Sequence, residues 1–148
     1  MKYEVSRGTL AIVPNEKNSS VVYEDENRYI VHQTPFSIME ESCKYFGSTY
    51  EGRKNGAKEI LGAEYKVPII VEDSSNLIVF PTTSPSAEDC VWISLGRVKR
   101  IEKIDPSNTK ILFDNNQSII VGCSYRTIEN QLSRASRLDL ILRNHKNS

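Results

Sequence analysis

Two adjacent cations, Arg53 and Lys54, lie between Gly52 and Gly56 in the segment of this sequence best suited to chemistry. Glycine lets the backbone approach a bulky partner closely, and neighbouring Arg and Lys side chains favour a polyanion. The segment therefore has the local chemistry of phosphate binding. No catalytic group stands beside it in the sequence, so we expect it to bind a ligand and not to catalyse a reaction.

The last helix that the sequence predicts carries a second set of such side chains. At 100° per residue, one face groups Arg126, Asn130, Ser133, Arg134 and Arg137 opposite an apolar stripe. Arg binds phosphates and guanine edges, Asn can pair with adenine, and the face is about 20 Å long. Many surface helices have a polar face for solubility alone, but three arginines without an interleaved acid favour a DNA-facing surface.

A third basic cluster, Arg97, Lys99 and Arg100, falls on a predicted strand over residues 90–104. Because side chains alternate along a strand, Arg97 and Lys99 should project from one face and Arg100 from the other. A basic strand beside a basic helix can follow a nucleic-acid backbone. The alternative is an edge strand whose charges prevent pairing with another chain.

The sequence offers little for catalysis or for metal binding. Its two histidines are His32 and His145, and no Cys-x-x-Cys or His-x-x-x-His spacing occurs. No glycine-rich nucleotide motif is present either, so we expect no metal, no cofactor and no enzyme activity. Cys43 falls at an apolar position of a predicted helix, which favours a buried, inert thiol. A cysteine-dependent enzyme is the remaining catalytic alternative.

The length of 148 residues fits a single domain, 1–148, with a sizeable core. No apolar run is long enough to span a membrane and the N-terminus lacks a signal-peptide core, so we expect a cytoplasmic protein with reduced cysteines. The net charge of zero is unevenly distributed, because residues 44–66 carry five cations against three anions and residues 96–148 carry ten against five. A local basic surface of this kind can bind nucleic acid.

The first residues predict three antiparallel strands. Short apolar runs at 10–13, 21–23 and 28–31 are separated by turn-forming residues, and Pro14 should end the first of them.

Two helices are predicted next. Thr34 is a good N-cap for the first, and Gly47 supplies a left-handed stop after it. Ser48 followed three residues later by Glu51 is a capping-box pattern, which predicts a second helix ending near Leu61. The two glycines inside that segment would each weaken a helix by roughly 1 kcal/mol, so a loop or a loose helical turn is the alternative.

The second half predicts further strands and then a long helix. The strands are expected at 67–71, 77–80, 90–104, 109–113 and 118–121. Ser124 can cap the last helix, whose apolar stripe consists of Ile128, Leu132, Ala135, Leu138 and Leu142. These elements predict an α+β fold, mainly antiparallel sheet with two or three helices, the last of them C-terminal and amphipathic.

Four segments of the sequence resemble the ComK family, the competence transcription factors of Gram-positive bacteria. They are Ser42-Cys43-Lys44-Tyr45-Phe46-Gly47-Ser48 running into Tyr50-x-Gly52-Arg53-Lys54-x-Gly56; Pro68-Ile69 with Phe80-Pro81-Thr82; Cys90-x-Trp92-Ile93-Ser94 with Val98-Lys99; and Ser124-Tyr125 with Glu129-Asn130-Gln131 and Arg134. They occur in the family's order and at similar spacing, from about Tyr3 to Leu142, and the first and fourth are unusual in combination.

The resemblance implies a transcription activator that binds double-stranded DNA. The family recognises an A-rich run and a T-rich run a few bases apart, through the minor groove and with bending of the duplex. The resemblance also implies a homo-oligomer, a dimer that forms a dimer of dimers on nucleoid DNA, and it makes RNA polymerase a further candidate partner. Such binding suits basic side chains, because A·T tracts have a narrow and strongly negative minor groove.

The candidate DNA-binding residues fall into two sets. Those that match the family pattern are Lys44, Arg53, Lys54, Lys99, Asn130 and Arg134. Those that rest on helix and strand geometry alone are Arg97, Arg100, Arg126 and Arg137.

The sequence departs from longer family members, which continue into a tail with a motif that a proteolytic adaptor recognises. Here the sequence stops at Ser148, shortly after the last helix. This puts adaptor binding through that tail in doubt and implies altered activation, either in a short paralogue or in a trimmed chain. The rival to DNA binding is a protein-interaction paralogue that pairs with a longer activator without contacting DNA itself.

Overall fold

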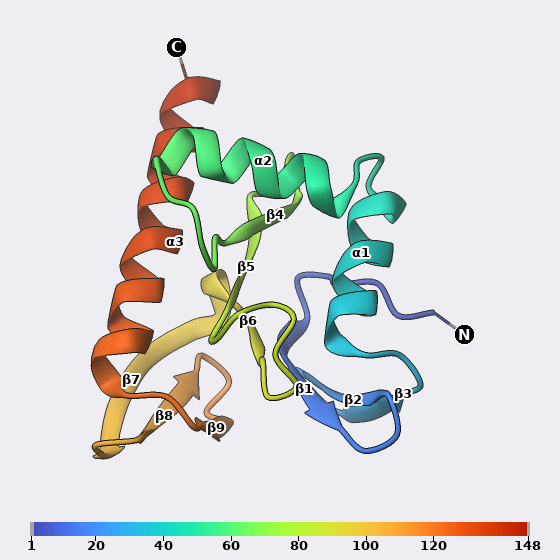
Figure 1. The fold of residues 1–148 in the computed structure, drawn as a ribbon, viewed down its shortest axis with the longest axis vertical. Helices are drawn as coiled ribbons and strands as arrows, with labels where there is room; N and C mark the ends of the chain where they lie inside the picture. The colour runs from blue at the N-terminus through green and yellow to red at the C-terminus, as the bar shows by residue number, and fades with distance from the viewer. Residues whose placement is uncertain (1, 148) are drawn as a thin grey trace.

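Two antiparallel sheets and three α-helices form within residues 2–147, the part of the chain that the computed structural model describes (Figure 1). The larger sheet has the strand order β3 (Arg28–Val31), β2 (Ser19–Glu24), β1 (Thr9–Asn15), β6 (Trp92–Ser94), β5 (Leu77–Pro81) and β4 (Ile69–Glu72). The smaller sheet has the order β7 (Val98–Asp105), β8 (Asn108–Phe113) and β9 (Ser118–Val121). The helices are α1 (Pro35–Tyr45), α2 (Tyr50–Leu61) and α3 (Tyr125–Lys146). The predicted α+β class, mainly antiparallel and with a C-terminal helix, is confirmed.

In the view of Figure 1 the helices stand on three sides of β4, β5 and β6, and β1, β2 and β3 lie below α1. There α3 runs along one side of the molecule, α1 lies on the other, and α2 crosses between them. The contacts explain this arrangement, because α2 packs against β4 and α3 packs against both β5 and β7. As a result, α3 joins the two sheets while its outward face is left to solvent.

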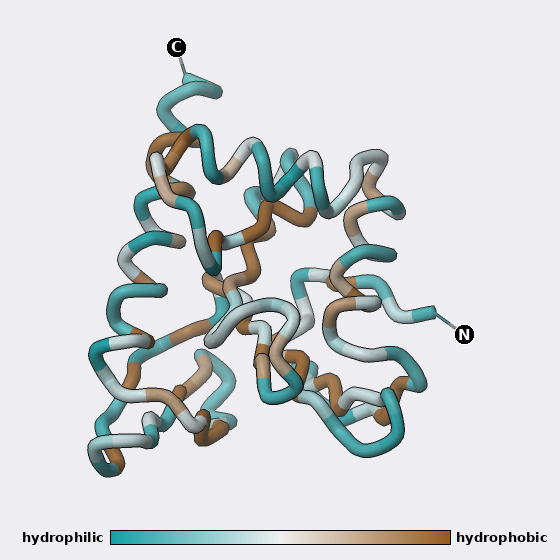
Figure 2. Tube along the Cα trace, in the orientation of Figure 1, coloured by the Kyte–Doolittle hydropathy of each residue, from teal (hydrophilic) through white to brown (hydrophobic). Residues whose placement is uncertain are grey.

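The core lies between the helices and the larger sheet, where Figure 2 shows the hydrophobic segments gathered along β4 and β5. Trp92 and Phe80 are fully buried there, as is the thiol of Cys43 that the helical pattern placed in the core. The ring of Tyr50 at the start of α2 meets Trp92 edge-on, with centroids 6.3 Å apart, and Phe36 of α1 at 4.8 Å. This aromatic cluster fixes the ends of α1 and α2 on the sheet.

The predicted N-caps of α1 and α3 are both confirmed. The hydroxyl oxygen of Thr34 accepts a hydrogen bond from the backbone N–H of Ser37 at 3.1 Å. The hydroxyl oxygen of Ser124 accepts one from the N–H of Thr127 at 3.2 Å. Each cap satisfies a donor that the first turn of a helix would otherwise leave without a partner.

The glycine-containing segment after α1 is a regular helix, α2, and not a loop. Its N-cap is Thr49, whose hydroxyl accepts from the N–H of Gly52 at 2.9 Å, so the capping box expected at Ser48 is wrong. Ser48 instead donates its N–H to the carbonyl of Cys43 and completes the end of α1. Gly62 ends α2 with a left-handed φ of 64°, a conformation that glycine adopts without strain.

Pro14 does not end the first strand, contrary to the prediction. It lies inside β1, where it pairs with Ser20 of β2. On the other side of β1, β6 pairs only with Ala11 and Ile12, so Pro14 has no strand beside it there. Proline is tolerated at such an edge-like position because its missing N–H is not needed for a second ladder.

The single strand expected over residues 90–104 is also wrong. A 3-10 turn, Leu95–Arg97, separates β6 from β7. Because β6 pairs within the larger sheet and β7 within the smaller one, the chain has to leave one ladder and enter the other at this point. Arg97 therefore lies in the turn, whereas Lys99 and Arg100 lie on β7 and are both exposed.

Arg97 connects the two sheets instead of presenting a free cation. Its Nε and Nη2 donate to Oδ1 of Asp114, at 3.0 and 2.7 Å, and its Nη1 donates to the carbonyl of Arg7 at 2.9 Å. Nη2 also contacts Asp25, in the turn between β2 and β3. The hydrogen bond from Arg97 holds the pKa of the Asp25 carboxyl below its usual value. With only 18% of its side chain exposed, Arg97 is a structural bridge.

We expect Arg97→Gln to lower the free energy of unfolding by about 2 kcal/mol at pH 7, because it removes charge-assisted hydrogen bonds. A depressed carboxylate pKa stabilises the fold above the unfolded pKa, near 4, and this contribution is lost as the pH falls through the folded value. The difference between parent and variant in urea denaturation should therefore shrink toward pH 3.

The matched control is Arg100→Gln, which removes the exposed ion pair of Arg100 with Glu102, 3.0 Å between Nε and Oε2. It should change stability by less than about 1 kcal/mol. Equal effects of the two substitutions would show that Arg97 does not connect the sheets.

Candidate nucleic-acid interface

The outward face of α3 forms a polar ridge, here called the α3 ridge, made of Arg126, Asn130, Ser133 and Arg137. All four residues are exposed because the opposite side of the helix is buried in the core. No ion pair among residues 2–147 involves Arg126 or Arg137. The two guanidinium groups stand eleven residues apart, or about 16 Å along the helix. The ridge can therefore present two available cations and an amide to one partner.

Two other side chains of α3, Gln131 and Arg134, hold the loop between α2 and β4. Gln131 donates its amide N–H to the carbonyl of Lys66 at 2.9 Å. Arg134 donates from Nη2 to the carbonyl of Tyr65 at 2.6 Å and from Nη1 to that of Lys66 at 3.3 Å. We call these contacts the carbonyl clamp. Burial lowers the pKa of Arg134, and its terminal nitrogens are occupied by the loop.

The carbonyl clamp brings Lys66 next to the α3 ridge. A shallow groove beside the helix is lined by Lys66, Thr127, Asn130, Gln131, Ser133 and Arg134. A second groove shares Lys66 and continues past Tyr65 to Lys54 of α2. Within residues 2–147, Lys54 forms one ion pair, with Glu51 at 3.6 Å, and such a pair is weak at the surface. The α3 ridge and Lys54 thus belong to one continuous surface.

The cations of β7 flank the other side of the ridge. Lys99 and Arg100 line a groove together with Tyr125, Glu129 and Arg143 of α3. The α3 residues of this groove lie on the opposite side of the helix from Lys66, given 100° per residue. Basic side chains therefore border the α3 ridge on both sides.

The remaining predicted residues lie apart from this surface. Lys44 is exposed on α1, which stands across the molecule from α3 in Figure 1. Its Nζ lies 4.0 Å from Oε1 of Glu41. Arg53 of α2 is partly buried and lies close enough to Cys43 of α1 for its positive charge to act on that thiol. Its Nε is buried and has no hydrogen-bond partner within residues 2–147. Lys54, which follows it, is therefore the cation of the glycine-flanked pair that reaches the shared groove.

Comparison with known proteins gives this geometry a context. Residues 1–147 match a family model described as "ComK protein". The chain is also 35% identical over 139 residues to the competence transcription factor of Bacillus subtilis (strain 168), an alignment that covers 92% of this chain and 72% of that protein. The chain belongs to the ComK family. No solved structure matches it.

Membership in the ComK family, a family of transcription regulators, confirms the resemblance found in the sequence. The residues that matched the family pattern have different surroundings in the structure. Asn130 lies on the α3 ridge and Lys54 on the shared groove, whereas Arg134 anchors a loop and Arg53 has its Nε buried. Lys66 completes the surface, and no local pattern in the sequence marked it.

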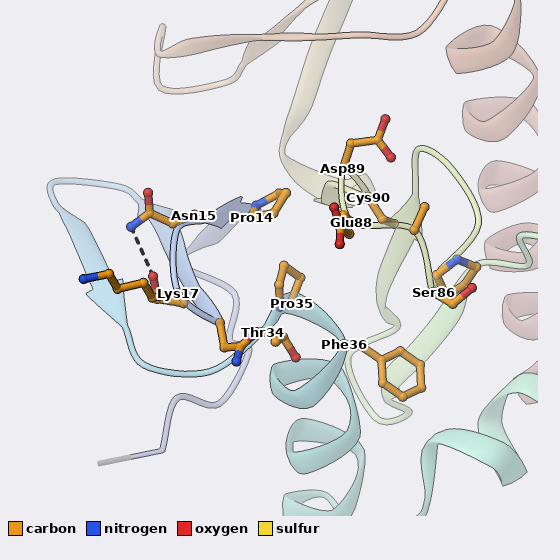
Figure 3. Close-up of a pocket in the computed structure, with 14 residues that line it drawn as sticks. Pro14, Asn15, Lys17, Thr34, Pro35, Phe36, Ser86, Glu88, Asp89 and Cys90 are labelled. Carbon is orange, nitrogen blue, oxygen red and sulfur yellow. Dashed lines mark hydrogen bonds between the residues drawn. The ribbon is translucent and has the colours of Figure 1, made fainter.

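The structure of this ComK-family chain also shows a hollow away from the α3 ridge, between the β1–β2 turn, the start of α1 and the loop before β6 (Figure 3). Lys17 lies on one side of it and Glu88 and Asp89 on the other. Burial raises the pKa of the Cys90 thiol at its edge, which disfavours the reactive thiolate. Within residues 2–147, no group of three or more His, Cys, Asp or Glu side chains could hold a metal ion. No helix of that range is long and apolar enough to cross a membrane.

The cysteines provide a direct test for a catalytic thiol. Burial raises the pKa of Cys43 to about 11, so only about one thiol in a thousand is ionised at pH 8. In the folded protein at pH 8, iodoacetamide should modify the partly exposed Cys123 first and leave Cys43 and Cys90 protected. All three should react in urea. Rapid modification of Cys43 in the folded protein, read by mass spectrometry, would instead support a cysteine-dependent enzyme.

Proposed function

We propose that this chain is a sequence-preferring DNA-binding transcription regulator of the competence type, without catalytic activity. The observation that carries the proposal is the α3 ridge. Arg126 and Arg137 form no ion pair among the described residues, and Lys66 shares a groove with Asn130 and Ser133 of the same ridge. DNA presents about one phosphate charge per 1.7 Å of duplex, and neutralising these charges releases condensed counterions. A cationic ridge in a protein of zero net charge supports this kind of binding.

The target in this proposal is a pair of A-rich and T-rich boxes, bound from the minor groove with bending of the duplex, as the family resemblance implies. Arginine is favoured in the narrow minor groove of A·T tracts because the negative potential there is enhanced. Bending costs elastic energy that additional backbone contacts offset. Arg126 and Arg137 would then occupy or border the groove, and Lys54, Lys66, Lys99 and Arg100 would contact the flanking phosphates.

Two boxes require more than one copy of this surface. The α3 ridge covers about 16 Å, roughly half of one helical turn of DNA. We therefore propose a homo-oligomer on DNA, a dimer or a dimer of dimers, that acts on the nucleoid in the cytoplasm. RNA polymerase is a further candidate partner, whereas a proteolytic adaptor is not.

The double variant Arg126→Ala/Arg137→Ala tests the α3 ridge. It should weaken binding to an A/T-box duplex by about tenfold or more and reduce the slope of log K against log salt by about 2, because the two cations no longer displace counterions from the duplex. Fluorescence anisotropy at several salt concentrations, with a scrambled duplex in parallel, measures affinity, sequence preference and slope together.

The control is Lys2→Ala/Arg28→Ala, which removes the same charge from the N-terminus and β3, across the molecule from α3 (Figure 1). It should leave affinity and slope close to those of the parent. Equal losses in both double variants would mean that binding follows net charge and not this surface. A parent chain that binds no duplex at low salt would favour the protein-interaction paralogue.

Lys54→Ala tests the α2 side of the surface and should reduce the salt slope by about 1. Arg53→Ala is a poorer probe, because its side chain is packed beside Cys43 and truncation changes that packing. A Lys54→Ala titration that overlays the parent curve would confine the contact to α3 and its neighbours.

A further inference from the structure

Tyr65 is the most exposed of the large hydrophobic side chains in residues 2–147, with 81% of its surface open to solvent. An aromatic ring in this position gains nothing from burial in the folded monomer. It lies in the connection between α2 and β4, beside the surface proposed to bind DNA. Its exposure leaves the ring available to a partner that binds this surface.

The backbone that carries Tyr65 is held firmly. Its carbonyl and that of Lys66 accept the hydrogen bonds of the carbonyl clamp, at 2.6, 2.9 and 3.3 Å. Lys66 has a positive φ of 51°, which costs energy in a residue with a side chain and persists only where the surroundings enforce it. The backbone from which the ring projects is thus held at a fixed place relative to α3.

The charges around Tyr65 suit a polyanion. Lys54 and Lys66 line the same groove as its ring. The acids of this groove are Glu51 and Glu64, and each forms an ion pair with a lysine of α2. The carboxylate of Glu51 lies 3.6 Å from Nζ of Lys54, and that of Glu64 lies 3.4 Å from Nζ of Lys58. The neighbouring groove, which shares Lys66, is lined on the α3 side by polar and basic residues with no acid among them: Thr127, Asn130, Gln131, Ser133 and Arg134.

We propose that Tyr65 inserts its ring partway between two base pairs of the bound DNA, from the minor groove. This inference rests on the proposed function and assigns a role to a residue outside the basic set. Aromatic and apolar side chains that enter the minor groove unstack a base step and kink the duplex. Stacking on the ring offsets part of the lost base stacking, and Lys66 beside it holds the phosphates.

The experiment uses an A/T-box duplex with 2-aminopurine placed at each adenine in turn, because its fluorescence rises when a base is unstacked. Binding of the parent protein should raise the 2-aminopurine fluorescence at one base step of the duplex. Tyr65→Ala should abolish this fluorescence rise and weaken binding by about tenfold. Tyr65→Phe should keep the fluorescence rise and the affinity of the parent. Since the ring is exposed, the thermal unfolding midpoint should not change in either variant.

Tyr45→Ala is the matched control, because Tyr45 is 66% exposed but lies on α1, away from the α3 ridge. Tyr45→Ala should bind the duplex with the affinity of the parent and cause the same rise in 2-aminopurine fluorescence. A 2-aminopurine rise that persists in Tyr65→Ala, or a parent that binds without any rise, overturns the insertion and leaves the proposed function intact. A parent that binds neither the box duplex nor the scrambled one overturns both.

Discussion

The position of α3 depends on one buried amide, that of Gln131. Only 1% of this residue is exposed, and its Nε2 donates both to the carbonyl of Lys66, at 2.9 Å, and to that of Pro81 in β5, at 2.7 Å. A buried amide without such partners would be strongly destabilising, so the geometry of these bonds restricts where the helix can lie. Arg134 adds its own bonds to the same loop. The core, the loop and the outward ridge of α3 are thereby fixed relative to one another.

Features of the fold that depend on neighbouring residues could be predicted from the sequence. Thr34 and Ser124 cap their helices through a donor three residues away, and the helical period placed Ile128 and Leu138 in the core. Features of the fold that depend on residues far away in the sequence could not be predicted. Whether Pro14 ends a strand depends on how far β6 extends beside it, and the break near Arg97 depends on a change from one sheet to the other.

The same distinction applies to the candidate interface. The period of α3 was enough to place Arg126, Asn130 and Arg137 on one exposed face. It could not show that Arg134, on the border of that face, is occupied by the carbonyls of a loop almost seventy residues earlier. Nor could it show Tyr65 and Lys66 beside the ridge, because the chain brings them there only through the carbonyl clamp.

The central claim is that the face around the α3 ridge contacts DNA, and amide chemical shifts of the 15N-labelled protein test it residue by residue. Titration with an A/T-box duplex should shift or broaden the amides from Arg126 to Arg137 and those of Glu64, Tyr65 and Lys66. The amides of β2 and β3, across the molecule, should not change in the first additions. Changes centred on β3 or α1, with the α3 amides unaffected, would contradict the account.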